Sequence, residues 1–211
     1  MANQKSLHLI KNILKELAKE RPLFHSEADF QHAFAMKFMQ ISNPKQIRLE
    51  RRFITENKKQ FELDMFVQTK NSKIGIELKY PQHKYETTFN EETFILKSHN
   101  NPGGNRYSFL YDIYRLEQLK ESKIINEGYA ILLTNVSKFH LDVKEKGRLE
   151  KLHLSKGRTI KAGETIEFNK TSKSPITPIK FPPFTFSKTY SEFTWEVYDE
   201  SNKFKYLIVE V

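Results

Sequence analysis

The sequence predicts an α/β fold. Three observations favour this class. Two helical segments with apolar stripes occupy the N-terminal part of the 211-residue chain, and a run of three strands follows them. A third, strongly periodic helix then leads into a short apolar segment bounded by Gly128 and Asn135, which is typical of a strand buried on both faces. The three strands in a row indicate a meander, and the later helix and strand extend it.

The two N-terminal helices have clear end signals. The first is expected over residues 3–20 and stops before Pro22. The second is expected to begin after Ser26, which can act as an N-cap, and to run to about Ile41. Its apolar stripe predicts the side that packs on the sheet and consists of Phe30, Ala33, Phe34, Phe38 and Ile41.

The meander is expected over 46–54, 61–67 and 73–80. In the second strand, Phe61, Leu63, Met65 and Val67 are expected on one face, with Glu62, Asp64 and Phe66 on the other, because side chains alternate along a strand. In the third strand, the same rule places Glu77 and Lys79 together on one face. A tight turn at Lys70-Asn71 would join these two strands as a hairpin.

After the meander, turn residues and periodicity predict shorter elements. A small hairpin is expected over 85–96, a Gly-rich loop over 98–105, a helix over 106–122 and a strand over 129–135. Residues 140–154 fit either a helix or a hairpin, and the proline-rich segment 170–183 is expected to be a loop. Segments 190–198 and 204–211 are expected to close the chain as a hairpin. The whole chain, 1–211, is expected to be a single domain.

Composition favours a polyanionic partner. The net charge is +9 and the pI about 9.5, and residues 138–188 carry 12 Lys and Arg against 5 Asp and Glu. The alternative is a solvated surface with surplus lysine. The absence of cysteine excludes disulfides and thiolate chemistry. No signal peptide and no spanning segment is expected, which predicts a cytoplasmic protein with no membrane partner.

The central hairpin carries the candidate site. Its register would set Asp64 opposite Glu77, with Cβ atoms roughly 4.5–5.5 Å apart, and Lys79 would lie on the same face. Two facing carboxylates repel each other unless a cation lies between them, and Mg²⁺ prefers such oxygen ligands. The alternative is that both acids are simply solvated on a polar strand face.

Two further positions bear on this site. Glu27 lies in the first turn of the second helix, on the side that faces the sheet, and is a candidate third carboxylate. It could equally be an N-terminal acid favoured by the helix dipole. Asp112 and Arg115 are three residues apart on a helix. Asp112 could either touch the site or only pair with Arg115, and we prefer the second.

The motif and the order of elements resemble the PD-(D/E)xK phosphodiesterase superfamily, which has the restriction endonuclease-like fold. Glu27, Asp64 and the triplet Glu77-Leu78-Lys79 carry the resemblance over about residues 23–135. The segments ELKY, RYSFLYDIYRLEQL, YAILLTN and FKYLIVEV resemble an uncharacterised prokaryotic branch of that superfamily. The proline of the family motif is missing, because Leu63 precedes Asp64.

The resemblance implies an αβββαβ core with a central mixed sheet flanked by helices, and a β-rich C-terminal extension over about 136–211. It also implies that Asp64, Glu77 and the Leu78 carbonyl ligate Mg²⁺ or Mn²⁺, with Glu27 as an auxiliary ligand. Lys79 would position or activate the attacking water and offset charge on the phosphorus centre. We expect Lys79 to stay charged beside the carboxylates when no cation is bound.

The expected function is therefore a Mg²⁺-dependent nuclease that hydrolyses DNA, with DNA preferred over RNA, acting in restriction or defence. The alternative is a catalytically inactive nucleic-acid-binding module on the same fold. A sugar- or membrane-binding protein is a third, weaker reading. A homodimer is left open, by analogy with many restriction enzymes.

Overall fold

The computed structural model describes residues 2–54, 60–98, 101–141, 149–168, 181–201 and 203–211. Its helices are α1 (Ala2–Glu20), α2 (Glu27–Ser42) and α3 (Pro102–Glu121), with two short 3-10 turns, η1 (Ser137–Phe139) and η2 (Glu150–Leu152). Its strands are β1 (Gln46–Ile54), β2 (Gln60–Gln68), β3 (Lys73–Lys79), β4 (Tyr85–Phe89), β5 (Glu92–Leu96), β6 (Glu127–Thr134), β7 (Thr165–Ile166), β8 (Phe184–Thr185), β9 (Trp195–Val197) and β10 (Lys205–Glu210).

Six strands form a central mixed sheet in the order β1-β2-β3-β6-β10-β9, which confirms the α/β class. β3 and β6 run parallel and are connected through α3, while the other neighbours are antiparallel. The C-terminal strand β10 lies directly beside β6. Part of the expected β-rich C-terminal region therefore completes the central sheet, and the short β7–β8 pair lies outside it.

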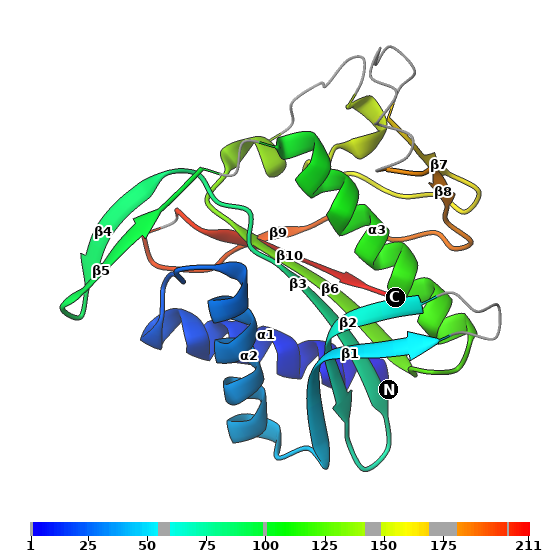
Figure 1. The fold of residues 1–211 in the computed structure, drawn as a ribbon, viewed down its shortest axis with the longest axis horizontal. Coiled ribbons are helices and arrows are strands. Elements are labelled where there is room, and N and C mark those ends of the chain that lie inside the picture. Colours follow the sequence, from blue (N-terminus) through cyan, green and yellow to red (C-terminus); the bar gives the residue numbers. More distant parts are fainter. Residues whose placement is uncertain (1, 55–59, 99–100, 142–148, 169–180, 202) are drawn as a thin grey trace.

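The sheet separates two apolar cores (Figure 1). On one face, α1 and α2 bury their apolar sides against β3 and β6, with Ile76, Leu78 and Ile131 among the buried strand residues. On the other face, α3 and the C-terminal segments pack over Ala130 and Leu132. All eight residues of β6 are buried, as expected for a strand covered on both sides.

β2 changes face at Asp64, which corrects the expected alternation. Met65 and Val67 belong to the core under α1 and α2, as expected. Phe61 and Leu63, expected beside them, instead lie in the core under α3 together with Phe66. The strand therefore does not keep a period of two through Asp64. The hairpin register itself is confirmed, because Met65 pairs with Ile76 and Gln68 with Lys73.

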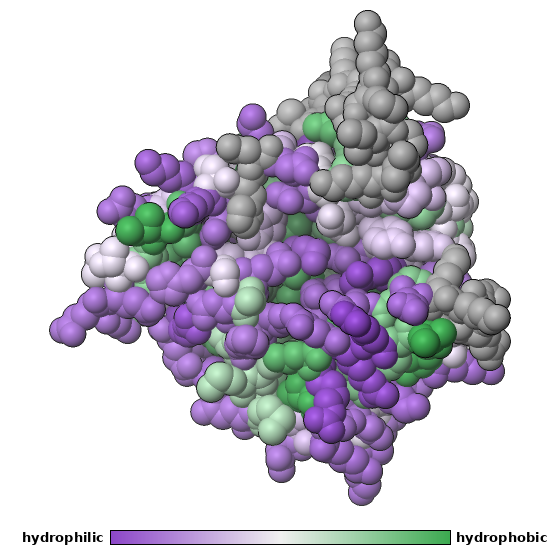
Figure 2. Space-filling model, viewed as in Figure 1, coloured by the Kyte–Doolittle hydropathy of each residue, from purple (hydrophilic) through white to green (hydrophobic). Residues whose placement is uncertain are grey.

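The ends of α2 follow its sequence signals. Ser26 is the N-cap and its hydroxyl accepts a hydrogen bond from the Asp29 amide at 3.1 Å. The first four members of the expected stripe are buried, but Ile41 is 37% exposed because the helix ends at Ser42 beyond the edge of the core. Nearby, Met36 and Met39 are also exposed, and Figure 2 shows hydrophobic surface low in the view over this region.

α3 begins at Pro102, so the expected loop over 98–105 is wrong for residues 102–105. Asn101 is the N-cap and accepts a hydrogen bond from the Gly104 amide at 3.0 Å, and Pro102 takes the first position of the helix. These two signals outweigh the low helix propensity of Gly103 and Gly104. The helix brings Leu110, Ile113 and Leu116 fully into the core, as expected.

The remaining expectations have mixed outcomes. The hairpin β4–β5 forms at the expected residues and projects from the body of the molecule (Figure 1). The described part of 140–154 holds only the turn η2, rather than a helix or a hairpin, and 142–148 lie outside the described residues. Most of the expected loop over 170–183 also lies outside them.

The closing hairpin is shorter than expected. β9 pairs with β10 from Trp195, whereas Tyr190 forms a bridge with Ile160 instead. Trp195 donates a hydrogen bond from its indole Nε1 to the Leu154 carbonyl at 2.8 Å, which ties β9 to the preceding segment. Of the helices that the structure describes, none is both long and apolar enough to cross a bilayer.

Candidate functional site

Lys79, the last residue of β3, lies at the centre of a group of acidic side chains. Its Nζ atom is 3.4 Å from Glu27 Oε1, 3.5 Å from Asp112 Oδ2 and 3.9 Å from Asp64 Oδ2. These three carboxylates come from α2, α3 and β2. The fold therefore brings together Glu27, Asp64 and Lys79, as the sequence predicts, and adds Asp112 from α3.

Asp64 lies where β2 leaves β3. The backbone pairing of the two strands extends from Gln68–Lys73 to Met65–Ile76, one position short of the expected pair between Asp64 and Glu77. Asp64 Oδ2 instead accepts a hydrogen bond from the Leu78 amide at 2.7 Å. The side chain thus takes the place of a strand carbonyl, which satisfies an amide that the diverging backbone would otherwise leave unpaired.

The backbone of Asp64 is held by the helix α2. Its carbonyl accepts a hydrogen bond from Gln31 Nε2 of α2 at 2.8 Å, and Gln31 is itself buried. The Asp64 carboxylate is therefore oriented by two neighbours, β3 and α2, and remains 25% exposed. Leu78 contributes its amide here, and the expected role of its carbonyl as a ligand stays a prediction.

Glu77 is almost completely buried, with 1% exposure, and pairs with Arg115 of α3. Its Oε1 accepts a hydrogen bond from Arg115 Nη2, whereas Oε2 has no hydrogen-bond partner among the described residues. The expectation that Glu77 and Asp64 directly face each other across the hairpin is therefore corrected: Glu77 is turned to α3. Arg115 was missed as a partner of Glu77, because the two are 38 residues apart.

Glu27 connects the start of α2 to the end of β3. Its Oε2 accepts a hydrogen bond from the Tyr80 amide at 2.8 Å while Oε1 faces Lys79. The ring of Tyr80 is buried, and its hydroxyl accepts a hydrogen bond from the Phe24 amide at 3.1 Å. The helix dipole is therefore not the only interaction of this carboxylate, because the Tyr80 amide, directly after β3, holds it at the site.

Asp112 reaches the site as well as pairing with Arg115. The two residues are 3.4 Å apart through Asp112 Oδ1, which confirms the expected pair. The preferred alternative, that Asp112 only pairs with Arg115, is wrong, because Asp112 Oδ2 lies 3.5 Å from Lys79. Asp112 is only 3% exposed, so it belongs to a buried network rather than to a surface ion pair.

Burial and mutual repulsion raise the pKa of the two deepest acids. Burial raises the pKa of Glu77 well above its usual value, with repulsion from Asp112 adding to the effect and Arg115 opposing it. Burial likewise raises the pKa of Asp112 to about 6, although Lys79 and Arg115 oppose it. For Lys79, burial lowers the pKa, but attraction to Asp112, Glu27, Asp64 and Glu77 outweighs burial and raises it. Lys79 is therefore charged, as expected.

The donor set fits a hard divalent cation. Four carboxylates and two cationic side chains meet here, which leaves a formal excess of two negative charges when all are ionised. Two buried carboxylate oxygens, Glu77 Oε2 and Asp112 Oδ2, accept no hydrogen bond from the described residues. Carboxylate oxygens are the ligands that Mg²⁺ and Mn²⁺ prefer.

The carboxylates of this cluster contact Lys79 and Arg115 rather than surrounding a position for a metal ion. Within the described part of the chain, no three acidic or histidine side chains are arranged to hold a metal ion as they stand. Lys79 lies among three of the carboxylates and Arg115 holds the fourth. Binding a cation would therefore require Lys79 or Arg115 to shift relative to their acidic partners.

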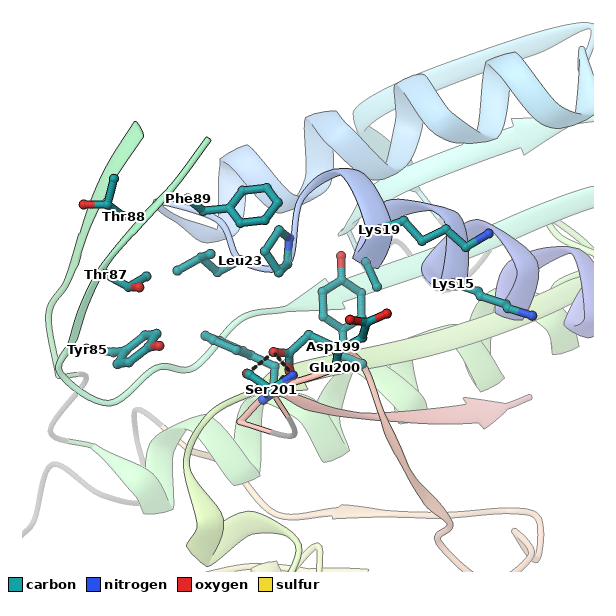
Figure 3. Close-up of a pocket in the computed structure, with 14 residues that line it drawn as sticks. Lys15, Lys19, Leu23, Tyr85, Thr87, Thr88, Phe89, Asp199, Glu200 and Ser201 are labelled. Atoms are coloured by element: carbon teal, nitrogen blue, oxygen red, sulfur yellow. Dashed lines mark hydrogen bonds between the residues drawn. The ribbon is translucent and has the colours of Figure 1, made fainter. Parts of the chain in front are cut away.

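A separate cavity of about 540 Å³ lies between α1, the hairpin β4–β5 and the turn before β10 (Figure 3). Lys15 and Lys19 approach it from α1, Tyr85 and Phe89 from β4, and Asp199 from the turn. None of the site carboxylates lines it. One of its lining residues, Phe204, stacks on Tyr80 with a distance of 5.9 Å between ring centroids, and Tyr80 follows Lys79 in the chain.

Comparison with protein-family models, with curated proteins and with solved structures found no match to this chain.

Proposed function

We propose that this protein is a Mg²⁺- or Mn²⁺-dependent nuclease that hydrolyses DNA phosphodiester bonds, in the context of restriction or defence. The observation that carries the proposal is the position of Lys79 within 4 Å of three carboxylates from three different elements, with the buried Glu77 two residues before it. Such a charged and partly unsatisfied cluster is costly to bury, and costly clusters concentrate at functional sites.

The order of elements also supports the proposal. α2, β1, β2, β3, α3 and β6 follow one another as in the αβββαβ core of the PD-(D/E)xK superfamily, with the small hairpin β4–β5 inserted before α3. The motif residues Asp64, Glu77 and Lys79 lie on adjacent strands β2 and β3, and Glu27 lies at the start of the preceding helix.

In this proposal Asp64 and Glu77 hold the cation together with the Leu78 carbonyl, and Glu27 is an auxiliary ligand. A bound divalent cation lowers the pKa of water and stabilises charge on the phosphate oxygens. The raised pKa of Lys79 keeps its ammonium group protonated, so it acts as a hydrogen-bond donor. It positions water or a phosphate oxygen and offsets negative charge in the transition state.

The preference for nucleic acid rests on charge. The chain carries a net charge of +9, and a cationic protein gains affinity for a phosphate backbone by releasing condensed counterions. The acidic cluster is partly buried within this basic protein, so that a phosphate backbone is attracted to the protein as a whole while the cation would offset the local negative charge.

The test is a cleavage assay on plasmid DNA, single-stranded DNA and RNA with Mg²⁺ or Mn²⁺. Asp64→Asn and Lys79→Met are expected to reduce cleavage by at least about 100-fold, because each removes a charge aligned with the reacting phosphate. Glu62→Gln is the matched control, since this acid is two residues before Asp64 on β2 but pairs with Arg52 at 2.7 Å. Wild-type protein that cleaves none of the substrates would overturn the nuclease proposal.

An inactive nucleic-acid-binding module on the same fold is the second candidate. The pairing of Glu77 with Arg115 favours it, because an internal cation already neutralises the most buried acid of this cluster. Calorimetric titration separates the two candidates. An inactive module would show no Mn²⁺ heat that depends on Asp64 and Glu77, while its DNA affinity would still fall steeply with salt.

A further inference from the structure

α3 carries two buried acids, Glu117 and Asp112, whose surroundings differ. Glu117 has 0% exposure, and its carboxylate accepts hydrogen bonds from the amides of Ser187 and Lys188 and from the Tyr190 hydroxyl. Both of its oxygens therefore have partners. This acid ties α3 to the C-terminal segment, and its burial is compensated within the fold.

Asp112 lies five residues earlier on the same helix and is compensated only in part, by the charges of Lys79 at 3.5 Å and Arg115 at 3.4 Å. It is 3% exposed, and its Oδ2 accepts no hydrogen bond from any described residue. A buried carboxylate oxygen without a hydrogen-bond donor destabilises the folded protein. Such an oxygen calls for an explanation, and a bound ligand that completes its contacts would provide one.

Asp112 points Oδ2, the oxygen that accepts no hydrogen bond from the described residues, at Lys79 and the acidic cluster. Arg115 approaches Oδ1 at 3.4 Å, which holds the carboxylate from the α3 side. Oδ2 is turned the other way and lies 3.5 Å from Lys79, the residue around which Glu27 and Asp64 also gather. The unsatisfied oxygen therefore faces the same space as the acids from α2 and β2.

We propose that Asp112 is a further oxygen ligand of the divalent cation, supplied by α3 in addition to the ligands from α2, β2 and β3. This inference rests on the proposed function, because it concerns the same cation. In this arrangement Glu77 Oε2 and Asp112 Oδ2, which accept no hydrogen bond from the described residues, both bind the cation. Arg115 holds the other oxygen of each of these two side chains.

The test is calorimetric titration of Mn²⁺ into the full chain without nucleic acid. Asp112→Asn keeps the size of the side chain and removes its charge, and it is expected to weaken Mn²⁺ binding by at least about tenfold. Glu117→Gln is the matched control, because it changes a buried acid on the same helix, and it should bind Mn²⁺ within about twofold of wild type. Thermal unfolding of each variant checks that it is folded.

The outcomes separate this inference from the proposed function. If wild type binds no Mn²⁺, the cation site itself is refuted, and this inference falls with it. If wild type binds Mn²⁺ and loses it with Asp64→Asn but not with Asp112→Asn, only the role of Asp112 is overturned. Equal losses in Asp112→Asn and Glu117→Gln would also overturn it, because they would show a general effect of disturbing α3.

A crystal of the wild-type protein soaked in Mn²⁺ gives a second readout that needs no variant to fold. Anomalous scattering should place an ion about 2.2 Å from Asp112 Oδ2 and from at least one oxygen of Asp64 or Glu77. An ion bound to Asp64 and Glu77 but more than about 4 Å from Asp112 would overturn the assignment.

Discussion

Glu50 of β1 lies opposite Asp64 of β2, and the two are skipped by the ladder that pairs Leu49 with Met65 and Arg51 with Leu63. Glu50 has φ 50°, in the left-handed region that residues with a side chain rarely adopt. The distortion therefore occurs at the same place in both strands, and it is also where β2 stops pairing with β3. A local break of this kind re-aims a side chain, and here it turns Asp64 toward Leu78 and Lys79.

The backbone of Glu50 should therefore control both stability and activity. Glu50→Gly should leave the free energy of unfolding unchanged or raise it by up to about 1 kcal/mol, because glycine tolerates positive φ. Glu50→Val should lower it by about 1–2 kcal/mol, since a branched side chain opposes this conformation. Urea unfolding measures both.

The matched control is Arg48→Val, an exposed position on β1 with no positive φ, where a β-branched residue suits a strand. Glu50→Val should also reduce any metal-dependent cleavage, because flattening β1 would move Asp64. Equal stability of Glu50→Val and Arg48→Val would contradict this account of the strand.

The metal-free protein should become less stable as pH rises through the range in which Asp112 ionises. Burial raises the pKa of Asp112 from 3.8 to about 6, so the folded state binds a proton that the unfolded state has already lost. The contribution of Asp112 to the free energy of unfolding is therefore largest below about pH 4 and is lost as pH rises above about 6. A shift of this size corresponds to roughly 3 kcal/mol.

Urea unfolding between pH 4 and pH 7 in the presence of a chelator measures this dependence. Glu77, whose pKa is also raised by burial, contributes in the same direction. Asp112→Asn should remove part of the change in unfolding free energy between pH 4 and pH 7. Glu62→Gln, which alters an exposed acid, should leave that change as it is in wild type. Parallel profiles for wild type and Asp112→Asn would show that Asp112 ionises normally.

In the proposed nuclease, Arg51 is expected to contact the nucleic-acid backbone, because it is exposed on β1 and pairs with Leu63, the residue before Asp64. Its guanidinium lies over the rings of Phe53 at 4.7 Å and Phe66 at 4.5 Å, and Phe66 belongs to the core on the α3 side of the sheet. Arg51→Ala should weaken DNA binding several-fold at low salt and reduce the magnitude of the salt slope by about 1, as expected for one lost phosphate contact.

Arg52 provides the comparison for Arg51. It is adjacent in the chain and equally cationic, but it is paired with Glu62 at 2.7 Å. Fluorescence anisotropy with labelled DNA and a chelator should therefore show a smaller loss for Arg52→Ala than for Arg51→Ala. Equal losses would mean that only the net charge of β1 matters.

Local patterns predicted those parts of the fold whose signals lie within a few residues. β1, β4 and β5 have the expected bounds, because alternation and turn residues delimit them. The register of the hairpin β2–β3 follows from its short turn, and the gathering of Glu27, Asp64 and Lys79 follows from motif spacing and the resemblance.

The missing parts of the site depend on tertiary packing. Arg115 reaches Glu77 because α3 packs on β3. The two residues are 38 positions apart, and no local spacing in the sequence predicts a contact over that separation. The change of face at Asp64 was missed because Phe61, Leu63, Met65 and Val67 alternate in the sequence. The apolar Phe66 on the other face was the one local signal of the change. The same packing makes Asp112 part of the site rather than a surface ion pair.

The start of α3 offers a prediction about a glycine that sequence rules treat as a helix breaker. A Cβ added at Gly104 would lie 2.2 Å from Asn101 Nδ2 and 2.7 Å from Asn101 Cγ, so the capping side chain would have to move. Asn101→Ala alone should cost about 1 kcal/mol of stability through the lost cap. In that background the steric conflict is absent, and Gly104→Ala should gain up to about 1 kcal/mol from its higher helix propensity.

In the wild-type background, by contrast, Gly104→Ala should leave the free energy of unfolding unchanged or lower it. The substitution raises helix propensity but displaces the Asn101 side chain that caps the helix. Urea unfolding of the two single variants and the double variant forms a cycle that should show a coupling of roughly 1 kcal/mol. Additive effects would mean that Asn101 does not cap α3 through the Gly104 amide. A coupled result would explain why a Pro-Gly-Gly segment begins the helix that carries Asp112 and Arg115 to the site.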